Sequence, residues 1–268
     1  MPESKYFFIK SQMNGFVLDV SGESHDPGAP VITYPKKDSD NDNQLWYEDH
    51  LTGTIRSKMH HLCLDINDHK NELVVNKYDK NRDKQKWEIA GEFIRNGKDK
   101  NLVLDIAAAN TKECARVCCW EQHGDDNQKW TFEYIKAKYF YISSQMHGKV
   151  IDIKKHKAEP GSKAVMYEKL DEPSDSQLWY ENKHGLLANK LTDFVLDSSD
   201  DGKIRLQPFS PDNDHQVWII DGEKICNRKN PNMVLDIKGA ATKDGAKLLE
   251  YEWHGDDNQK WLVENAHL

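Results

Sequence analysis

The chain has 268 residues, of which 37% are hydrophobic, 31% charged and 10% aromatic, and its formal net charge at pH 7 is −8. This length suits one large domain or two of ordinary size, and the balance of residue types excludes a disordered chain or a fibre. The negative charge, with lysines interspersed among acids, opposes a nucleic-acid role, because phosphate binding needs a concentrated basic face.

Targeting and redox signals are weak. Residues 1–10 show no basic segment followed by a long apolar run, and no later run reaches the length of a membrane span. We therefore expect no transmembrane segment, and a protein that is cytoplasmic or secreted without a signal peptide. The cysteines are odd in number and unrelated in spacing, so neither a disulfide framework nor a zinc site is expected. They are Cys63, Cys114, Cys118, Cys119 and Cys226.

Short strand signals separated by dense turn signals run through the chain. In the first forty residues or so, FVLDV (16–20), VITYP (31–35) and QLWYED (44–49) are β-branched or aromatic runs between Gly, Pro, Asn and Asp clusters. No segment keeps a helical apolar period beyond about two turns. This pattern predicts an all-β protein.

A Gln-x-Trp motif then recurs at intervals of about forty residues, which indicates internal repeats. Two copies belong to an identical octapeptide, HGDDNQKW, at 123–130 and 254–261. The six copies are Gln44–Trp46, Gln85–Trp87, Gln128–Trp130, Gln177–Trp179, Gln216–Trp218 and Gln259–Trp261. We expect the Trp to pack in the core and the Gln to bond backbone groups that a loop would otherwise leave unpaired.

An apolar-Leu/Ile-Asp segment precedes each motif, and the spacing between them has a period of three repeats. The intervals from this Asp to the Trp are 27, 22, 25, 27, 21 and 25 residues. A six-bladed propeller has no reason to show such a super-period, whereas two domains of three repeats do. Residues 5–20 also match residues 138–153. The sequence therefore predicts two tandem β-trefoil domains, 1–134 and 135–268.

With these motifs the sequence resembles the R-type, ricin B-chain-like lectins, and within them the tandem galactose-binding lectins of earthworms. The resemblance covers both halves and all six repeats. It implies binding of galactose- or N-acetylgalactosamine-type glycans on glycoproteins or glycolipids, with several sites able to cross-link or agglutinate. It implies neither catalysis nor a cofactor or metal. We expect a monomer, with a dimer as the alternative.

The resemblance also implies a site in each repeat. It combines the Asp of the early strand, an aromatic residue about fifteen positions on, a Lys or His, and the Asn just before the Gln-x-Trp. A carboxylate accepts two adjacent sugar hydroxyls, an amide donates and accepts, and an aromatic ring covers the apolar C–H patch of a pyranose. Galactose, with its axial 4-hydroxyl, leaves one such patch unbroken.

Three repeats carry the complete set. In the first repeat it is Asp19, Tyr34, Lys37, Asn43 and Gln44; in the third, Asp105, Trp120, His123, Asn127 and Gln128; and in the sixth, Asp236, Tyr251, His254, Asn258 and Gln259. In the sixth repeat Trp253 lies on the same strand face as Tyr251, so either ring is a candidate for stacking.

The other repeats are incomplete. The fourth keeps Asp152, Tyr167 and Gln177 but has Ser176 in place of Asn, so we expect a weakened site. The second has Lys84 and the fifth has His215 at that position, so we expect both to be empty. They would keep only Asp65 with Tyr78, and Asp197 with Phe209.

Several other interpretations compete with this one. The Asp and Asn residues would cap turns in any loop-rich protein. The alternating Asp38, Asp40 and Asp42 superficially resemble a calcium loop but lack its Gly and Glu. Adjacent carboxylates at 125–126 and 256–257 are not the separated pair that a glycoside hydrolase needs. A trefoil that binds a protein partner, for example a cytoskeletal one, is the alternative function.

Overall fold

The computed structural model describes residues 2–50, 52–198, 201–211 and 213–267, and its regular structure in these ranges consists of twenty-four strands and nine 3-10 turns. The predicted all-β class is confirmed. Each 3-10 turn has three residues, so none of the described helices is long enough to cross a bilayer.

The strands fall into six groups of four, one group for each Gln-x-Trp repeat. The first three repeats contain β1 (Glu3–Ser11), β2 (Val17–Val20), β3 (Ala29–Tyr34) and β4 (Trp46–Asp49); β5 (Thr54–Ser57), β6 (Cys63–Ile66), β7 (Leu73–Asn76) and β8 (Trp87–Ala90); and β9 (Phe93–Asn96), β10 (Leu102–Ile106), β11 (Ala115–Glu121) and β12 (Trp130–Lys136).

The last three repeats have the same layout. They contain β13 (Phe140–Ser144), β14 (Val150–Ile153), β15 (Ser162–Tyr167) and β16 (Trp179–Glu181); β17 (Leu187–Asn189), β18 (Val195–Ser198), β19 (Ile204–Gln207) and β20 (Trp218–Asp221); and β21 (Lys224–Asn227), β22 (Met233–Ile237), β23 (Ala246–Glu252) and β24 (Trp261–Asn265).

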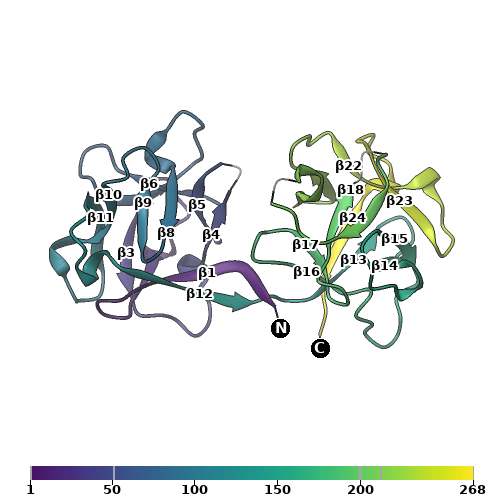
Figure 1. Ribbon diagram of the computed structural model, residues 1–268, viewed down its shortest axis with the longest axis horizontal. Helices are drawn as coiled ribbons and strands as arrows, with labels where there is room; N and C mark the ends of the chain where they lie inside the picture. The colour runs from purple at the N-terminus through teal and green to yellow at the C-terminus, as the bar shows by residue number, and fades with distance from the viewer. Residues whose placement is uncertain (1, 51, 199–200, 212, 268) are drawn as a thin grey trace. The chain divides into compact units, whose positions relative to one another are not determined.

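Two compact units result, with the strands up to β12 in one and those from β13 on in the other (Figure 1). By contacts the N-terminal unit is Lys5–Ile135, and the C-terminal unit is Lys136–Leu268 together with residues 2–4. Those first residues join the C-terminal unit through Ala137, whose N–H donates to the Pro2 carbonyl at 2.9 Å. The predicted boundaries 1–134 and 135–268 stay a prediction, and their outer ends, residues 1 and 268, lie outside the described residues.

The third strands of the three repeats meet around a pseudo-threefold axis in each unit. In the N-terminal unit β3 pairs with both β7 and β11, and Glu72 bridges to Cys118. In the C-terminal unit β15 pairs with both β19 and β23, and Lys203 bridges to Leu249. Three short all-β repeats cannot bury their apolar faces separately, so they share one core along this axis.

The motif tryptophans and the strand residues before each Asp fill that core. Leu18, Leu64 and Leu104 are fully buried in the N-terminal unit, and Ile151, Leu196 and Leu235 are their C-terminal counterparts. Five of the six motif indoles also donate Nε1–H to the carbonyl of this apolar residue, at 2.8–3.3 Å. Trp218 is equally buried, but its Nε1 has no hydrogen-bond partner among the described residues.

This difference predicts unequal costs for two matched substitutions in the C-terminal unit. Trp179→Phe removes a buried indole that donates to Ile151 at 3.0 Å, whereas Trp218→Phe removes an unpaired one. A buried hydrogen bond contributes about 1 kcal/mol, and an unpaired buried donor contributes nothing favourable. We therefore expect Trp179→Phe to lower the free energy of unfolding by about 1 kcal/mol more than Trp218→Phe, measured by urea denaturation. Equal losses would contradict this account.

Candidate functional site

A buried glutamine holds a buried aspartate in every repeat. The Gln Nε2 donates to the Asp Oδ2 at 2.9–3.2 Å in all six copies. The same amide nitrogen donates to a carbonyl at the end of the third strand of the repeat, and the Gln Oε1 accepts a backbone N–H. All six glutamines are at most 1% exposed. The glutamines therefore have no donor left for a ligand and are positioning residues. These include the four that the sequence placed in the sugar set, Gln44, Gln128, Gln177 and Gln259.

The third repeat brings its predicted residues together around the end of β10. Asp105 is 4% exposed, and the Asn127 Nδ2 donates to its Oδ2 at 3.0 Å. The His123 Nε2 lies 3.3 Å from the same oxygen, and its Nδ1 lies 3.2 Å from a carboxylate oxygen of Asp125. Trp120 lines the same pocket with 59% of its surface exposed. A buried carboxylate, an amide and an imidazole thus lie beside an open aromatic face.

The sixth repeat has the same geometry at the end of β22. The Asn258 Nδ2 donates to the Asp236 Oδ2 at 2.9 Å, and the His254 Nε2 lies 3.5 Å from it. The His254 Nδ1 lies 3.3 Å from Asp256, as in the third repeat. Burial raises the pKa of the Asp236 carboxyl above its usual range, although the Gln259 amide opposes this shift.

Strand register distinguishes the two candidate rings of the sixth repeat. Val234 pairs with Tyr251 just as Val103 pairs with Trp120, so Tyr251 holds the position of Trp120. Tyr251 is 55% exposed. Trp253 lies two residues further on, where the Lys224 ammonium sits 5.4 Å from its ring centroid.

The first repeat gathers Asp19, Tyr34, Lys37 and Asn43 around one pocket. The Lys37 Nζ donates to the Asn43 Oδ1 at 3.2 Å and to Glu23 at 2.6 Å. Burial raises the pKa of Asp19, against the opposing effects of the Gln44 amide and the Lys37 ammonium. The Lys37 ammonium therefore contacts the amide, and the Asn43 Nδ2 donates to the Val20 carbonyl at 3.3 Å, whereas in the third repeat the imidazole and the amide both lie against the carboxylate.

In the fourth repeat other side chains occupy the position of the missing amide. Ser176 is 1% exposed, and its hydroxyl lies 2.8 Å from the His156 Nδ1 and 3.0 Å from the Ser174 hydroxyl. Leu170, whose backbone N–H donates to Gln177, stands where the first repeat has Lys37. The repeat therefore lacks the amide and the Lys37 ammonium, while the His156 Nδ1 lies 3.8 Å from the Asp152 Oδ1. Leu170 lies seven residues before its Gln, as Lys37 does, so spacing alone could have revealed this loss.

In the second repeat an arginine fills the site from within the chain. The Arg82 Nε lies 2.8 and 2.6 Å from the two oxygens of Asp65, and Asn76 donates to the same carboxylate at 2.9 Å. Register places Asn76, paired with Cys63, at the position of Trp120. The pairing of Asp65 with Tyr78 is therefore wrong, because the shorter hairpin shifts the aromatic residue out of register. No signal in the sequence identified Arg82.

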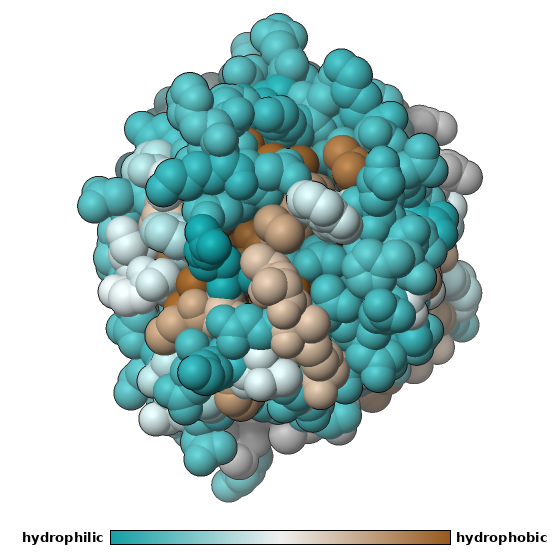
Figure 2. Space-filling model, turned by 90° about the vertical axis from the view of Figure 1, so that its left-hand side faces the viewer, coloured by the Kyte–Doolittle hydropathy of each residue, from teal (hydrophilic) through white to brown (hydrophobic). Residues whose placement is uncertain are grey.

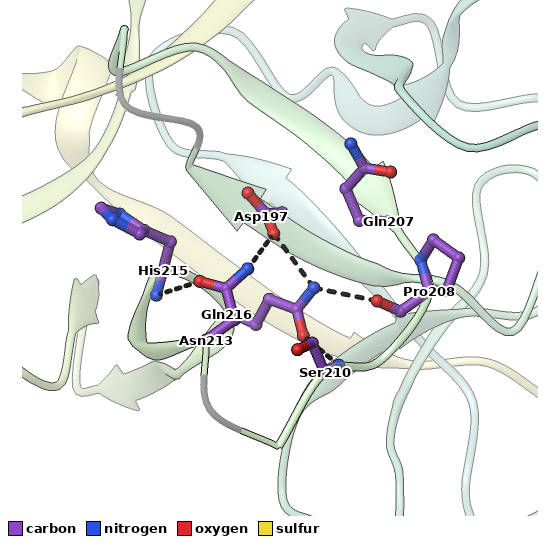
Figure 3. Close-up of a pocket in the computed structure, with 7 residues that line it drawn as sticks. All are labelled: Asp197, Gln207, Pro208, Ser210, Asn213, His215 and Gln216. Carbon is purple, nitrogen blue, oxygen red and sulfur yellow. Dashed lines mark hydrogen bonds between the residues drawn. The ribbon is translucent and has the colours of Figure 1, made fainter.

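In the fifth repeat an amide from a different position in the sequence contacts the aspartate, as Figure 3 shows. The Asn213 Nδ2 donates to the Asp197 Oδ2 at 2.8 Å, while the His215 ring points away from the carboxylate. Gln207, paired with Val195, stands at the aromatic position and makes no hydrogen bond to the other residues drawn (Figure 3). Phe209 instead stacks on His184 with ring centroids 4.2 Å apart, so its pairing with Asp197 is also wrong.

Within the described ranges, no three His, Cys, Asp or Glu side chains are grouped as a metal ion would need. Asp42 of the acidic loop is paired with the Lys58 ammonium at 2.5 Å.

Arg82 is predicted to be essential for the stability of the N-terminal unit. Arg82→Met would leave the fully buried Asp65 carboxylate without its cation, which costs about 3 kcal/mol or more. Lys84→Met is the matched control, because Lys84 pairs only with the exposed Asp68 and should change stability by about 0.5 kcal/mol or less. Urea denaturation of the full chain measures both. Equal stability of the two variants would refute the role given to Arg82.

Comparison with known proteins identifies a family for the chain. The family model described as ricin-type beta-trefoil lectin domain matches residues 5–130 and 138–261. Mucoricin from Rhizopus delemar is 52% identical over 44 residues, which span 16% of this chain and 30% of mucoricin.

Two solved structures are also similar. The earthworm R-type lectin C-half, in complex with GalNAc, is 36% identical and covers 50% of this chain and all of its own, with a TM-score of 0.46. A non-toxic homologue of type II RIPs from Momordica charantia is 18% identical, covers 98% of both chains and has a TM-score of 0.45. Because the family model covers both repeat triplets and nearly the whole length, the chain belongs to the ricin-type β-trefoil lectin family.

Proposed function

We propose that this protein is a multivalent lectin that binds terminal galactose or N-acetylgalactosamine through its first, third and sixth repeats. The observation that carries the proposal is the repeated cluster of a buried Asp, an amide and a cationic or imidazole side chain beside an exposed ring. It occurs in both units, at Asp105 and at Asp236.

The hydrogen bonds leave one carboxylate oxygen available for a ligand. In the third and sixth repeats the Gln, Asn and His side chains all converge on Oδ2 of the Asp. Among the described residues only the Cys118 thiol, at 4.0 Å, approaches the Asp105 Oδ1. In the second repeat, by contrast, Arg82 contacts both oxygens of Asp65. A free Oδ1 beside an amide and an imidazole suits two adjacent sugar hydroxyls.

The exposed rings then favour one sugar configuration. Trp120 and Tyr251 present flat apolar surfaces beside the polar cluster, where the C–H face of a pyranose would stack. An axial 4-hydroxyl keeps that face clear while presenting the 3- and 4-hydroxyls to the carboxylate. This supports galactose-type over glucose-type ligands.

Affinity at each site would be weak, and several sites would act together. The pockets are shallow and open to water, so a single monosaccharide would bind with a Kd of roughly tens of micromolar to millimolar. Sites in both units would bind two glycans at once, and the avidity would exceed single-site affinity by roughly a hundredfold. Cross-linking of glycans, seen as agglutination, is the expected activity.

Binding of a protein partner is the alternative function. Hydrophobic areas occupy only the minor part of the face of the molecule that Figure 2 shows. A large apolar patch is the usual mark of a protein-docking surface, so this face favours the sugar interpretation. Inhibition by free galactose or lactose distinguishes the two functions, because only the lectin would be blocked.

The ring residues provide the sharpest test of the sugar sites. Trp120→Ala and Tyr251→Ala remove exposed side chains, so the fold should persist while galactose affinity at each altered site falls about tenfold or more. Tyr78→Ala is the control, since this exposed ring lies out of register and rests beside Arg56 and Lys86. Isothermal titration with galactose measures affinity and stoichiometry.

The double variant Trp120→Ala/Tyr251→Ala should retain only the first-repeat site and should agglutinate cells poorly. Unchanged stoichiometry, or agglutination equal to that of the parent protein, would contradict the assignment. The Tyr78→Ala protein should match the parent in both assays.

Galactose binding should also be lost in acid. An ionised Asp accepts stronger hydrogen bonds from sugar hydroxyls than a protonated one, and burial raises the pKa of Asp236 above its ordinary value of 3.8. Binding at the sixth repeat should therefore be complete well above this raised pKa and should decline as the pH falls through it, with a midpoint above pH 3.8. NMR titration of the Tyr251 amide with galactose measures the affinity at each pH, and circular dichroism checks the fold. Full affinity at pH 3.8 in a folded protein would refute the role of the carboxylate.

A further inference from the structure

A basic cavity lies on the pseudo-threefold axis of the C-terminal unit, where β15, β19 and β23 meet. Its volume is about 150 Å³, enough for a few water molecules or a small anion. Ala164, Ile204 and Leu248, each 2% exposed, are its apolar lining. Lysine side chains surround this lining, namely Lys163, Lys203, Lys238 and Lys247.

Three of these lysines are not neutralised. Lys163, Lys238 and Lys247 are exposed and make no hydrogen bond or ion pair with any residue that the structure describes. The acidic residue of the lining, Asp201, is already paired with Lys203 and with the Arg205 guanidinium at 3.3 Å. Like charges around a partly enclosed, low-dielectric space repel one another, so the cavity concentrates a positive potential in a protein whose net charge is −8.

The N-terminal unit offers an internal comparison, because its strands have the same register. The positions equivalent to Lys163, Lys203, Lys238 and Lys247 are Pro30, Glu72, Ala107 and Arg116. Here the one cation and the one anion neutralise each other, since the Arg116 Nη1 bonds to the Glu72 carboxylate. The fold therefore does not require the four lysines around the cavity of the C-terminal unit.

We propose that this cavity binds an oxyanion group, a sulfate or phosphate ester or a carboxylate, carried by a small ligand. Lysine ammonium groups bind such groups as point charges, and an incoming anion relieves their mutual repulsion. The cavity adjoins the sugar pocket of the sixth repeat, because Lys238 and Leu249 correspond to Ala107 and Cys118 of the third-repeat pocket. Lys247, however, precedes Tyr251 by four residues on β23, or about 13 Å along the strand. The C-terminal unit thus has an anion site in addition to its proposed sugar site.

NMR titration of the full chain tests this site. Inorganic sulfate, inorganic phosphate and N-acetylneuraminic acid are added separately, each in the presence of saturating galactose so that the sugar pockets are occupied. We expect the amides of Ala164, Ile204 and Leu248 to shift, with a Kd on the order of millimolar that weakens as sodium chloride is raised. The probe that binds most tightly identifies the preferred oxyanion.

A pair of double variants supplies the control. Lys163→Gln/Lys247→Gln should weaken binding of that probe at least tenfold. Lys112→Gln/Lys183→Gln removes the same charge from exposed positions that do not line the cavity, and should change the affinity less than twofold. Circular dichroism and galactose binding should be unchanged in both variants.

Three results would overturn the proposal. One is the absence of shifts at the cavity amides with all three probes. Another is an equal loss of probe affinity in the two double variants, which would mean that net charge alone causes the loss. The third is shifts confined to Tyr251 and His254, which would place the anion in the sugar pocket. None of these results bears on galactose binding itself, so the two sites are tested independently.

Discussion

The bond between the motif glutamine and the strand aspartate is the constraint on which this molecule depends. It places a carboxylate that is nearly inaccessible to water at the surface end of each repeat, and it occupies one oxygen of that carboxylate. The other oxygen accepts a backbone N–H in the second and fourth repeats. The same glutamine pins the loop that carries the remaining site residues. The fold and the site therefore share one side chain, so all six repeats keep it whether or not they are suited to a sugar.

What distinguishes the six repeats is the group that reaches the aspartate from its neighbourhood. In the third and sixth repeats an imidazole and an amide approach the same oxygen of the aspartate, and in the first repeat an ammonium contacts the amide. In the second repeat a guanidinium takes both oxygens and converts the same carboxylate into a structural ion pair. The acceptor is satisfied there from within the chain, and the Asp–Gln bond of the scaffold is kept.

Symmetry has a second consequence at the axis of each unit. Equivalent positions of the third strands meet there, and they hold Pro30, Glu72 and Arg116 in the N-terminal unit but Lys163, Lys203 and Lys247 in the C-terminal unit. The N-terminal unit pairs Arg116 with Glu72, whereas the C-terminal unit leaves Lys163 and Lys247 unpaired beside its cavity. The two units thus have the same strand layout and different charge patterns at the axis.

The sequence by itself determined the all-β class, the period of three and the Asp, Gln and Trp positions, because these recur with a spacing that only a threefold repeat explains. Tertiary structure decided which ring stands beside each carboxylate: the hairpins of the second and fifth repeats are shorter, so Asn76 and Gln207, and not Tyr78 and Phe209, occupy that register position. It also decided what fills each site, since Arg82 and Asn213 reach their aspartates from loops. Long side chains from different loops can reach the same buried carboxylate, and the number of residues between them in the sequence does not predict which of them will do so.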